Sequence, residues 1–368
     1  MKIRPKKNIS AIKLYQPGRP IDEVKRSLGL KRVEKMASNE NFLKPSAAVM
    51  TAIRKSLPEI NRYPDGGCYL LREDLAKRFK VRPDQIVVGN GSDEIILLAL
   101  KAFVAPGDEV VMADPTFLMY RIGAQVVGAQ VKAVPLVNYR YDLPSMLRAV
   151  TKKTKIIFIA NPDNPTGSFI GQDELDSFLK KVPQNVIVFL DEAYYEYARE
   201  KRAYPDTMSA YLGKRAVIIT RTFSKIYSLA GLRVGYGFSS ADIIDSLNRV
   251  RDPFNVNAVA QAAARAAMRD VRHVRETLRA MRRGREYLYA EFRRLNVDYI
   301  DSATNFILFK VKKNPREIYK ALLKNGVIIR DISSWGLKNC LRVTIGSMKE
   351  NTFFIRMLKK VLEGEPRA

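Results

Sequence analysis

Residues 85–100 read QIVVGNGSDEIILLAL, where a short apolar run, a glycine turn and an apolar-periodic segment follow one another. The run QIVV predicts a strand, and the spacing of Ile and Leu from residue 95 onward predicts a helix. A strand that enters a helix through a short glycine turn is a building unit of α/β sheets. This stretch therefore indicates the fold class.

Four further apolar runs repeat the pattern along the chain. They are DEVVMAD (108–114), KIIFIAN (155–161), NVIVFLDEA (185–193) and RAVIITRTF (215–223). Helical patterns such as ELDSFLKKV (174–182) separate them. Continuous Val, Ile and Leu are typical of strands buried on both faces of a parallel sheet. We predict an α/β protein with a mostly parallel central sheet, whose functional loops lie at the carboxyl ends of the strands.

The predicted sheet belongs to a large domain over residues 36–257. Residues 1–35 carry eleven Lys and Arg against three Asp and Glu, and we interpret them as an N-terminal arm with a short helix. After residue 257 the chain becomes rich in Ala and Arg at helical spacing, which predicts a long helical stretch, and then alternates strands, among them VIIRD (327–331), with helices. Residues 258–368 are therefore predicted to form a smaller C-terminal α+β domain.

Composition limits the function classes. The chain has 368 residues, of which 46% are hydrophobic, so it is long enough for a large core. Its net charge of 64 − 38 = +26 favours a nucleic acid, an anionic membrane surface or an acidic small molecule as partner. One histidine and two distant cysteines argue against a Cys/His metal site and a histidine-dependent triad. No apolar run suits a membrane span or a secretory signal, so we expect a cytoplasmic protein.

Two candidate catalytic residues lie at or just beyond the ends of apolar runs. Lys225 follows the run RAVIITRTF, and Asp191 lies near the end of the run NVIVFLDEA. Lys225 lies among Thr222, Ser224 and Ser228, where a desolvated ammonium can lose its proton as a Schiff-base lysine does. A surface lysine is the alternative, and this segment alone does not decide between them. Asp191 ends the run VIVFLD, where a buried carboxylate needs a cationic partner such as a protonated pyridine nitrogen.

Two loops carry polar groups suited to an anionic ligand. The turn NPDNPTGS (161–168) presents Asn164, whose amide can donate to an anionic oxygen. Ser92 begins the helix after the glycine turn, and the backbone N–H groups of a first helical turn suit a phosphate. Any strand-to-helix connection needs a turn and a cap, so this signal is weak in isolation.

In chain order, the segments GNGSDE, DPTF, NPDNPTG, DEAYYEY, SK and AGLRVGYG resemble the fold type I pyridoxal-phosphate enzymes, specifically the class I/II aminotransferase superfamily. The resemblance covers nearly the whole chain. It implies a homodimer with shared active sites, in which Lys225 bonds to pyridoxal phosphate and moves the substrate proton, Asp191 pairs with the ring nitrogen, and Tyr194 bonds the 3′ oxygen. The other cofactor-binding residues that it implies are Gly91, Ser92, Asp93, Phe117, Asn164, Thr222, Ser224, Arg233 and, toward the neighbouring subunit, Tyr63.

Within the superfamily, the segments SNEN (38–41), RYPD (62–65), NGVIIRD (325–331) and CLRVTIGS (340–347) are similar to the branch that transaminates histidinol phosphate with 2-oxoglutarate in histidine biosynthesis. The resemblance implies that two arginines bind the substrate phosphate, because paired guanidinium groups suit that anion. The substrate-binding residues that it implies are Tyr15, Asn39, Arg330 and Arg342.

Three alternatives stay open. The segment 42–44 (FLK) and the single tryptophan, Trp335, depart from the pattern of this branch and leave room for an aromatic amino-acid aminotransferase. A phosphothreonine decarboxylase is a more distant relative. The charge of +26 is compatible with a nucleic-acid-binding protein that keeps the fold, although an Arg-rich helix is more often a solvated face.

Overall fold

The computed structural model describes residues 3–12 and 18–364. These residues divide into two compact units. The first unit contains residues 3–12, 45–164 and 169–271, and the second contains residues 18–44, 165–168 and 272–364. The three-part division at residues 35 and 257 stays a prediction of the sequence.

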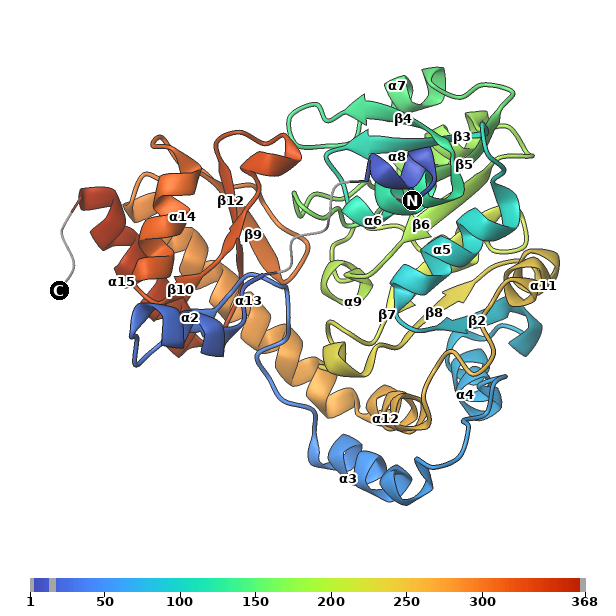
Figure 1. The fold of residues 1–368 in the computed structure, drawn as a ribbon, viewed down its shortest axis with the longest axis horizontal. Helices are drawn as coiled ribbons and strands as arrows, with labels where there is room; N and C mark the ends of the chain where they lie inside the picture. Colours follow the sequence, from blue (N-terminus) through green and yellow to red (C-terminus); the bar gives the residue numbers. More distant parts are fainter. Residues whose placement is uncertain (1–2, 13–17, 365–368) are drawn as a thin grey trace. The chain divides into compact units, whose positions relative to one another are not determined.

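A seven-stranded sheet forms the centre of the first unit (Figure 1). Six strands run in one direction, and the remaining strand, β8, is antiparallel to both of its neighbours. In spatial order the strands are β2 (Ile86–Gly89), β8 (Gly235–Phe238), β7 (Val217–Thr222), β6 (Ile187–Asp191), β5 (Thr154–Ala160), β3 (Glu109–Asp114) and β4 (Gln130–Pro135). The predicted α/β fold with a mostly parallel sheet is confirmed.

Helices cover both faces of this sheet. On one face, Met112 and Phe158 pack in a buried cluster with side chains of α5 (Ser92–Phe103), α6 (Leu118–Val127) and α11 (Ala241–Arg249). On the other face, Val111 and Ile157 pack with side chains of α7 (Leu143–Arg148), α8 (Gln172–Lys181) and α10 (Thr207–Tyr211). Because successive strand residues face opposite ways, both sets of positions are apolar, which explains the continuous runs in the sequence.

The remaining α-helices described in the first unit are α1 (Lys7–Ser10), α3 (Ala47–Ser56), α4 (Tyr69–Phe79), α9 (Tyr195–Ala198) and α12 (Ala258–Arg269). Short 3-10 helices lie at Leu57–Glu59, Pro83–Gln85 and Ala230–Leu232. Helix α12 packs against α3 and α4. Across the described residues of both units, no helix combines the length and the apolar character needed to cross a membrane.

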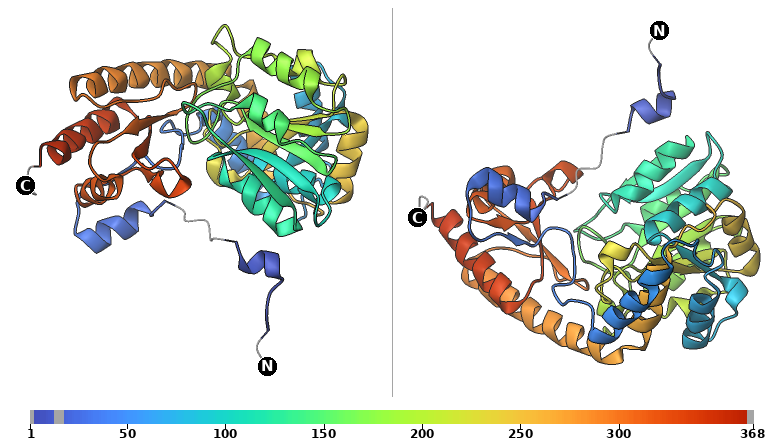
Figure 2. Two further views of the ribbon diagram at one scale, coloured as in Figure 1. Left: turned by 90° about the horizontal axis from the view of Figure 1, so that it is seen from above. Right: turned by 60° about the horizontal axis from the view of Figure 1, so that its bottom comes forward.

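The second unit contains a three-stranded antiparallel sheet in the order β11 (Arg330–Asp331), β12 (Cys340–Thr344) and β9 (Phe306–Lys310), and a short parallel pair of β1 (Glu34–Lys35) with β10 (Val327–Ile328). Its helices are α2 (Ile21–Leu28), α13 (Val271–Arg294), α14 (Pro315–Lys324) and α15 (Met348–Glu363), with a 3-10 turn at Ser333–Trp335. Figure 2 shows α13 in orange as a long helix.

Two predicted elements of the C-terminal region are divided in the structure. The predicted strand 327–331 splits at Ile329, because β10 pairs with β1 while β11 pairs with β12. The predicted long helical stretch after residue 258 breaks at Asp270, which is the C-cap of α12 and adopts a non-helical backbone conformation.

Candidate active site

The strand ends bring the predicted cofactor-binding residues to one edge of the central sheet. Asp191, the last residue of β6, pairs in register with Thr220 of β7. Two residues further along β7, Thr222 pairs with Gly235 of β8, which in turn pairs with Gly89 at the end of β2. The loops that follow β2, β6 and β7 therefore begin next to one another. This edge is where open α/β sheets bind their ligands.

The backbone at the start of α5 lies very close to the backbone of β8. Gly91 is the N-cap of α5 with φ of 81°, and no side chain caps the helix. A Cβ atom at Gly235 would lie 2.5 Å from the backbone nitrogen of Ser92, and one at Gly91 would lie 2.7 Å from Nη2 of Arg233. Gly235 therefore needs glycine because the colliding atoms belong to the backbone, and Gly91 needs glycine because its φ of 81° strains any other residue. The backbone N–H groups of the first turn, together with the helix dipole, form a site for an anion.

Arg233 adds a positive charge at this helix start. Its Nη1 donates to Oγ of Ser224 at 3.3 Å, and its Nη2 forms an ion pair with Oδ2 of Asp93 at 3.2 Å. The backbone nitrogen of Ser224 donates to Oγ1 of Thr222 at 3.1 Å. The structure thus brings together the residues predicted to bind the cofactor phosphate, and a guanidinium with a hydroxyl is a suitable donor set for that group.

Asp191 is a buried carboxylate held by three hydrogen bonds. Tyr120 donates to Oδ2 at 2.7 Å, while the backbone nitrogen of Ala193 and Oγ1 of Thr220 donate to Oδ1 at 3.2 and 3.4 Å. Burial raises the pKa of Asp191 from 3.8 to about 6, and the hydrogen bonds oppose that shift. A cationic nitrogen beside this carboxylate would favour its charged form.

The other predicted cofactor-binding residues of the first unit lie in segments that follow strands β3, β5, β6 and β7. Lys225 is half-buried, and its Nζ lies 5.7 Å from the centroid of the buried Tyr194 ring. Asn164 is half-buried in the loop after β5. Phe117 is the N-cap residue of α6, and its ring meets the Tyr120 ring edge to face at a centroid distance of 5.6 Å.

This donor set fits pyridoxal phosphate. The α5 start with Arg233 suits its phosphate, the buried carboxylate of Asp191 suits its ring nitrogen, and the amine of Lys225 suits its carbonyl carbon. Phe117 is half-buried, and an aromatic side chain is suited to stack on a planar ring. Gly235 contributes indirectly, because without a Cβ atom there the backbone at the start of α5 can lie against β8.

Tyr63, which is predicted to reach the cofactor of the neighbouring subunit, precedes the other predicted cofactor-binding residues in the sequence and is 83% exposed. Its ring stacks on that of Phe254 at a centroid distance of 4.7 Å and an interplanar angle of 18°. Other large apolar side chains nearby in the sequence are exposed as well, namely Leu57, Ile60, Tyr69 and Leu70. A concentration of exposed apolar side chains of this kind is typical of an interaction surface.

The substrate-binding residues predicted in the second unit lie on adjacent strands. Arg330 of β11 is the register partner of Arg342 of β12, so both side chains leave the same face of the small sheet. Arg342 is buried, and its Nη2 donates to the carbonyl oxygen of Ala37 at 3.0 Å. The guanidinium of Arg330 lies 5.7 Å from the Trp335 ring centroid. Like charges directly opposite each other are destabilising, which favours an anion at this point.

Asn39 is close to the same strand. It is buried, adopts a left-handed backbone conformation with φ of 55°, and its backbone nitrogen donates to Oγ1 of Thr344 at 3.0 Å. Because Thr344 is two residues beyond Arg342 on β12, Asn39 and Arg342 belong to one cluster within the second unit. Tyr15, the fourth predicted substrate-binding residue, lies outside the described residues.

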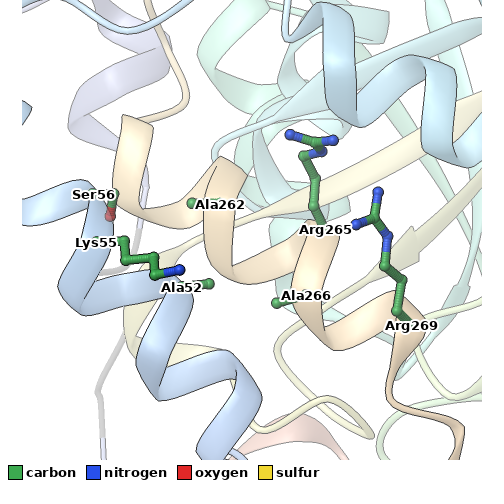
Figure 3. Close-up of a pocket in the computed structure, with 7 residues that line it drawn as sticks. All are labelled: Ala52, Lys55, Ser56, Ala262, Arg265, Ala266 and Arg269. Carbon is green, nitrogen blue, oxygen red and sulfur yellow. The ribbon is translucent and has the colours of Figure 1, made fainter.

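A separate open pocket lies between α3 and α12 (Figure 3). Three alanines and Ser56 line it with the basic residues Lys55, Arg265 and Arg269. Both arginines form ion pairs with Asp74 at 2.7 and 3.1 Å. None of the residues that line this pocket is among those predicted for the cofactor or the substrate.

Sequence reasoning missed two features of the site. Tyr120, the partner of Asp191, follows Phe117 by three residues, and this helical spacing is a signal that places both on one face of α6. The second feature is a fully buried ion pair between Glu192 and Arg221, at 2.8 Å, which joins β6 to β7 next to Asp191. Its two residues lie in the quoted apolar runs, but no local pattern indicates their pairing.

Comparison with known proteins identifies the family. The model for "Aminotransferase class I and II" matches residues 31–358, which is most of the chain. The chain therefore belongs to the class I and II aminotransferases.

Its relatives carry more specific names. It is 47% identical over 356 residues to the histidinol-phosphate aminotransferase of Moorella thermoacetica, and the alignment covers 96% of this chain and 92% of the relative. It is 42% identical to histidinol-phosphate aminotransferase 2 of Carboxydothermus hydrogenoformans, over 97% of this chain and 99% of that protein. Among solved structures, the histidinol-phosphate aminotransferase of Sinorhizobium meliloti in complex with pyridoxal-5′-phosphate superposes with a TM-score of 0.90 at 26% identity, covering 100% of this chain and 99% of that one.

Proposed function

We propose that this chain transfers the amino group of L-histidinol phosphate to 2-oxoglutarate, which yields imidazole-acetol phosphate and L-glutamate in histidine biosynthesis. The proposal rests mainly on Arg330 and Arg342, which lie opposite each other on β11 and β12. Two neighbouring guanidinium groups can bind one phosphate. The names of the relatives at 42–47% identity, which cover nearly the full chain, support the same substrate.

As a class I and II aminotransferase, the chain is a pyridoxal-phosphate-dependent transaminase. When bound, pyridoxal phosphate supplies a ring that withdraws electrons from the bonds at the amino carbon of the substrate. Side chains of the protein transfer the proton and hold the reactants in place. We assign proton transfer at the substrate Cα to Nζ of Lys225, because an amine in a partly desolvated loop can act as a general base.

Other side chains hold the reactants. The buried carboxylate of Asp191 would pair with the ring nitrogen and favour its protonated form, since a buried negative charge stabilises a neighbouring positive one. We assign the phosphate to the start of α5 with Ser224 and Arg233, the 3′ oxygen to Asn164 and Tyr194, and the face of the ring to Phe117. Residues that contact both ends of the cofactor would limit its rotation, which would keep the amino carbon of the substrate within reach of Lys225.

A homodimer with shared active sites belongs to the proposal. The stacked pair of Tyr63 and Phe254 is exposed, and further exposed apolar side chains lie between residues 57 and 70. Burying these side chains against a second copy would remove apolar surface from water. The hydroxyl of Tyr63 is assigned to the cofactor phosphate of the partner subunit. A cytoplasmic location, as expected from the sequence, completes the proposal.

The first experiment is an absorbance spectrum of the purified protein before and after histidinol phosphate is added, repeated with phenylalanine and tyrosine. We expect conversion of the cofactor band with histidinol phosphate and little with the other two amines. Conversion chiefly by phenylalanine or tyrosine would instead assign the chain as an aromatic amino-acid aminotransferase. A protein that takes up no pyridoxal phosphate would overturn the enzyme assignment.

A second experiment tests the arginine pair. Arg330→Gln removes one guanidinium, and we expect kcat/KM for histidinol phosphate to fall by roughly 10- to 100-fold, as for the loss of a charged hydrogen bond. Activity with histidinol, which lacks the phosphate, should change little. Arg316→Gln is a matched control, because Arg316 is an exposed arginine of the same unit. Equal losses with both substrates would contradict the assignment of the phosphate to Arg330.

A further inference from the structure

Tyr120 occupies a buried position between two residues assigned to the cofactor. Its side chain is fully buried, and its ring stacks on Phe158 at a centroid distance of 4.8 Å and an interplanar angle of 11°. The ring also makes an edge-to-face contact with Phe117. The hydroxyl at the end of this packed ring donates to Oδ2 of Asp191 at 2.7 Å.

The hydrogen bond from Tyr120 is the shortest of those described for Asp191. The other two donors, Ala193 and Thr220, both reach Oδ1, so Tyr120 holds the second oxygen of the carboxylate. Two groups on the helices packed against Asp191 act on its charge in opposite directions. The hydroxyl of Tyr120 on α6 lowers the pKa of Asp191, whereas the negative charge of Asp93 on α5 raises it.

We propose that Tyr120 is a positioning residue that orients the Asp191 carboxylate and keeps it ionised for the ring nitrogen of the cofactor. This inference rests on the proposed function, because it requires pyridoxal phosphate at the site. Each carboxylate oxygen has two lone pairs, so Asp191 can accept from Tyr120 and still face a ring nitrogen. Burial raises the pKa of Asp191, and the hydrogen bond from Tyr120 opposes this shift. Without the hydroxyl, the pKa would rise further and the neutral form of Asp191 would be favoured.

A purely structural role is the competing explanation, because a buried tyrosine needs a hydrogen-bond partner in any case. Tyr141 provides the matched control. It is also buried, and its hydroxyl also donates to a carboxylate, at 3.1 Å to Oδ1 of Asp163. Tyr120→Phe and Tyr141→Phe each remove a buried hydroxyl that donates to a carboxylate, but only the first removes a donor from Asp191. The hydroxyl of Tyr141 also bonds Thr116 and accepts from the backbone nitrogen of Ala160, so Tyr141→Phe removes at least as many hydrogen bonds from the protein.

The test measures binding of pyridoxal phosphate to the cofactor-free protein between pH 5 and 8, with protein fluorescence as the signal. In the wild type, affinity should rise as Asp191 ionises. Tyr120→Phe should weaken binding about tenfold near pH 6 and move the midpoint upward by about one pH unit, as the loss of a hydrogen bond to a charged group predicts. Tyr141→Phe should follow the wild-type curve.

The variant Asp191→Asn tests whether Tyr120 acts through Asp191. If Tyr120 acts through Asp191, adding Tyr120→Phe to Asp191→Asn should change the affinity no further. A Tyr120→Phe curve identical to that of the wild type, or an equal shift in Tyr141→Phe, would overturn the role of Tyr120. Failure of the wild-type protein to bind pyridoxal phosphate would instead overturn the proposed function, so the two failures are distinguishable.

Discussion

Gly235→Ala should disrupt the phosphate site by a backbone collision. The added Cβ would lie 2.5 Å from the nitrogen of Ser92 and 2.8 Å from the carbonyl carbon of Gly91, whereas ordinary contacts begin at 3.4 Å. The start of α5 must then move away from β8 by 3.4 − 2.5 = 0.9 Å. The atoms that collide belong to the backbone, so no side chain can rotate to relieve the contact. Overpacking of this kind costs about 1–3 kcal/mol of stability.

The displaced amides are those assigned to the cofactor phosphate, and losing one charged hydrogen bond weakens binding by roughly 10- to 100-fold. The assay is titration of the cofactor-free protein with pyridoxal phosphate, together with the thermal unfolding midpoint. Gly231→Ala is the control, because a Cβ at Gly231 meets nothing within 4 Å. Wild-type affinity in Gly235→Ala, or an equal loss in Gly231→Ala, would refute the reasoning.

Three further predictions concern buried or reactive groups. Arg221→Met leaves the buried carboxylate of Glu192 without its ion-pair partner, so it should destabilise the protein by about 3–5 kcal/mol in denaturant unfolding, and Glu192→Met in addition should restore part of the loss. The pKa of Asp191 is raised from 3.8 to about 6, so the folded apoprotein holds a proton that the unfolded chain releases, and its stability should fall by about 3 kcal/mol as the pH rises from 4 to above 6. Asp191→Asn should lack this fall, and a stability difference between the two proteins that is independent of pH would contradict the shift. Borohydride reduction of the holoenzyme should attach the cofactor to the peptide that contains Lys225, and Lys225→Ala should yield no labelled peptide.

Local patterns were sufficient for the fold class. The apolar runs around Phe158 and Phe189 are continuous because both faces of each strand are covered, and that property is visible in the sequence itself. The loops of Gly91 and Lys225 stood out for a similar reason, since each follows a strand and has a distinctive composition, but the roles predicted for them came from the resemblance of the ordered motifs to a family. Such features depend on residues within a few positions of one another.

Contacts between distant residues required the tertiary structure. The hydrogen bond from Tyr120 to Asp191 joins residues 71 positions apart, and the ion pair of Glu192 with Arg221 forms because β6 and β7 lie in register. The split of the predicted strand at Ile329 depends on β1, whose residues lie almost 300 positions earlier. Sequence patterns report which faces are buried, because burial is read from local periodicity. They do not report which buried polar groups meet, because that follows from strand order and register, and these are set by packing across the whole unit.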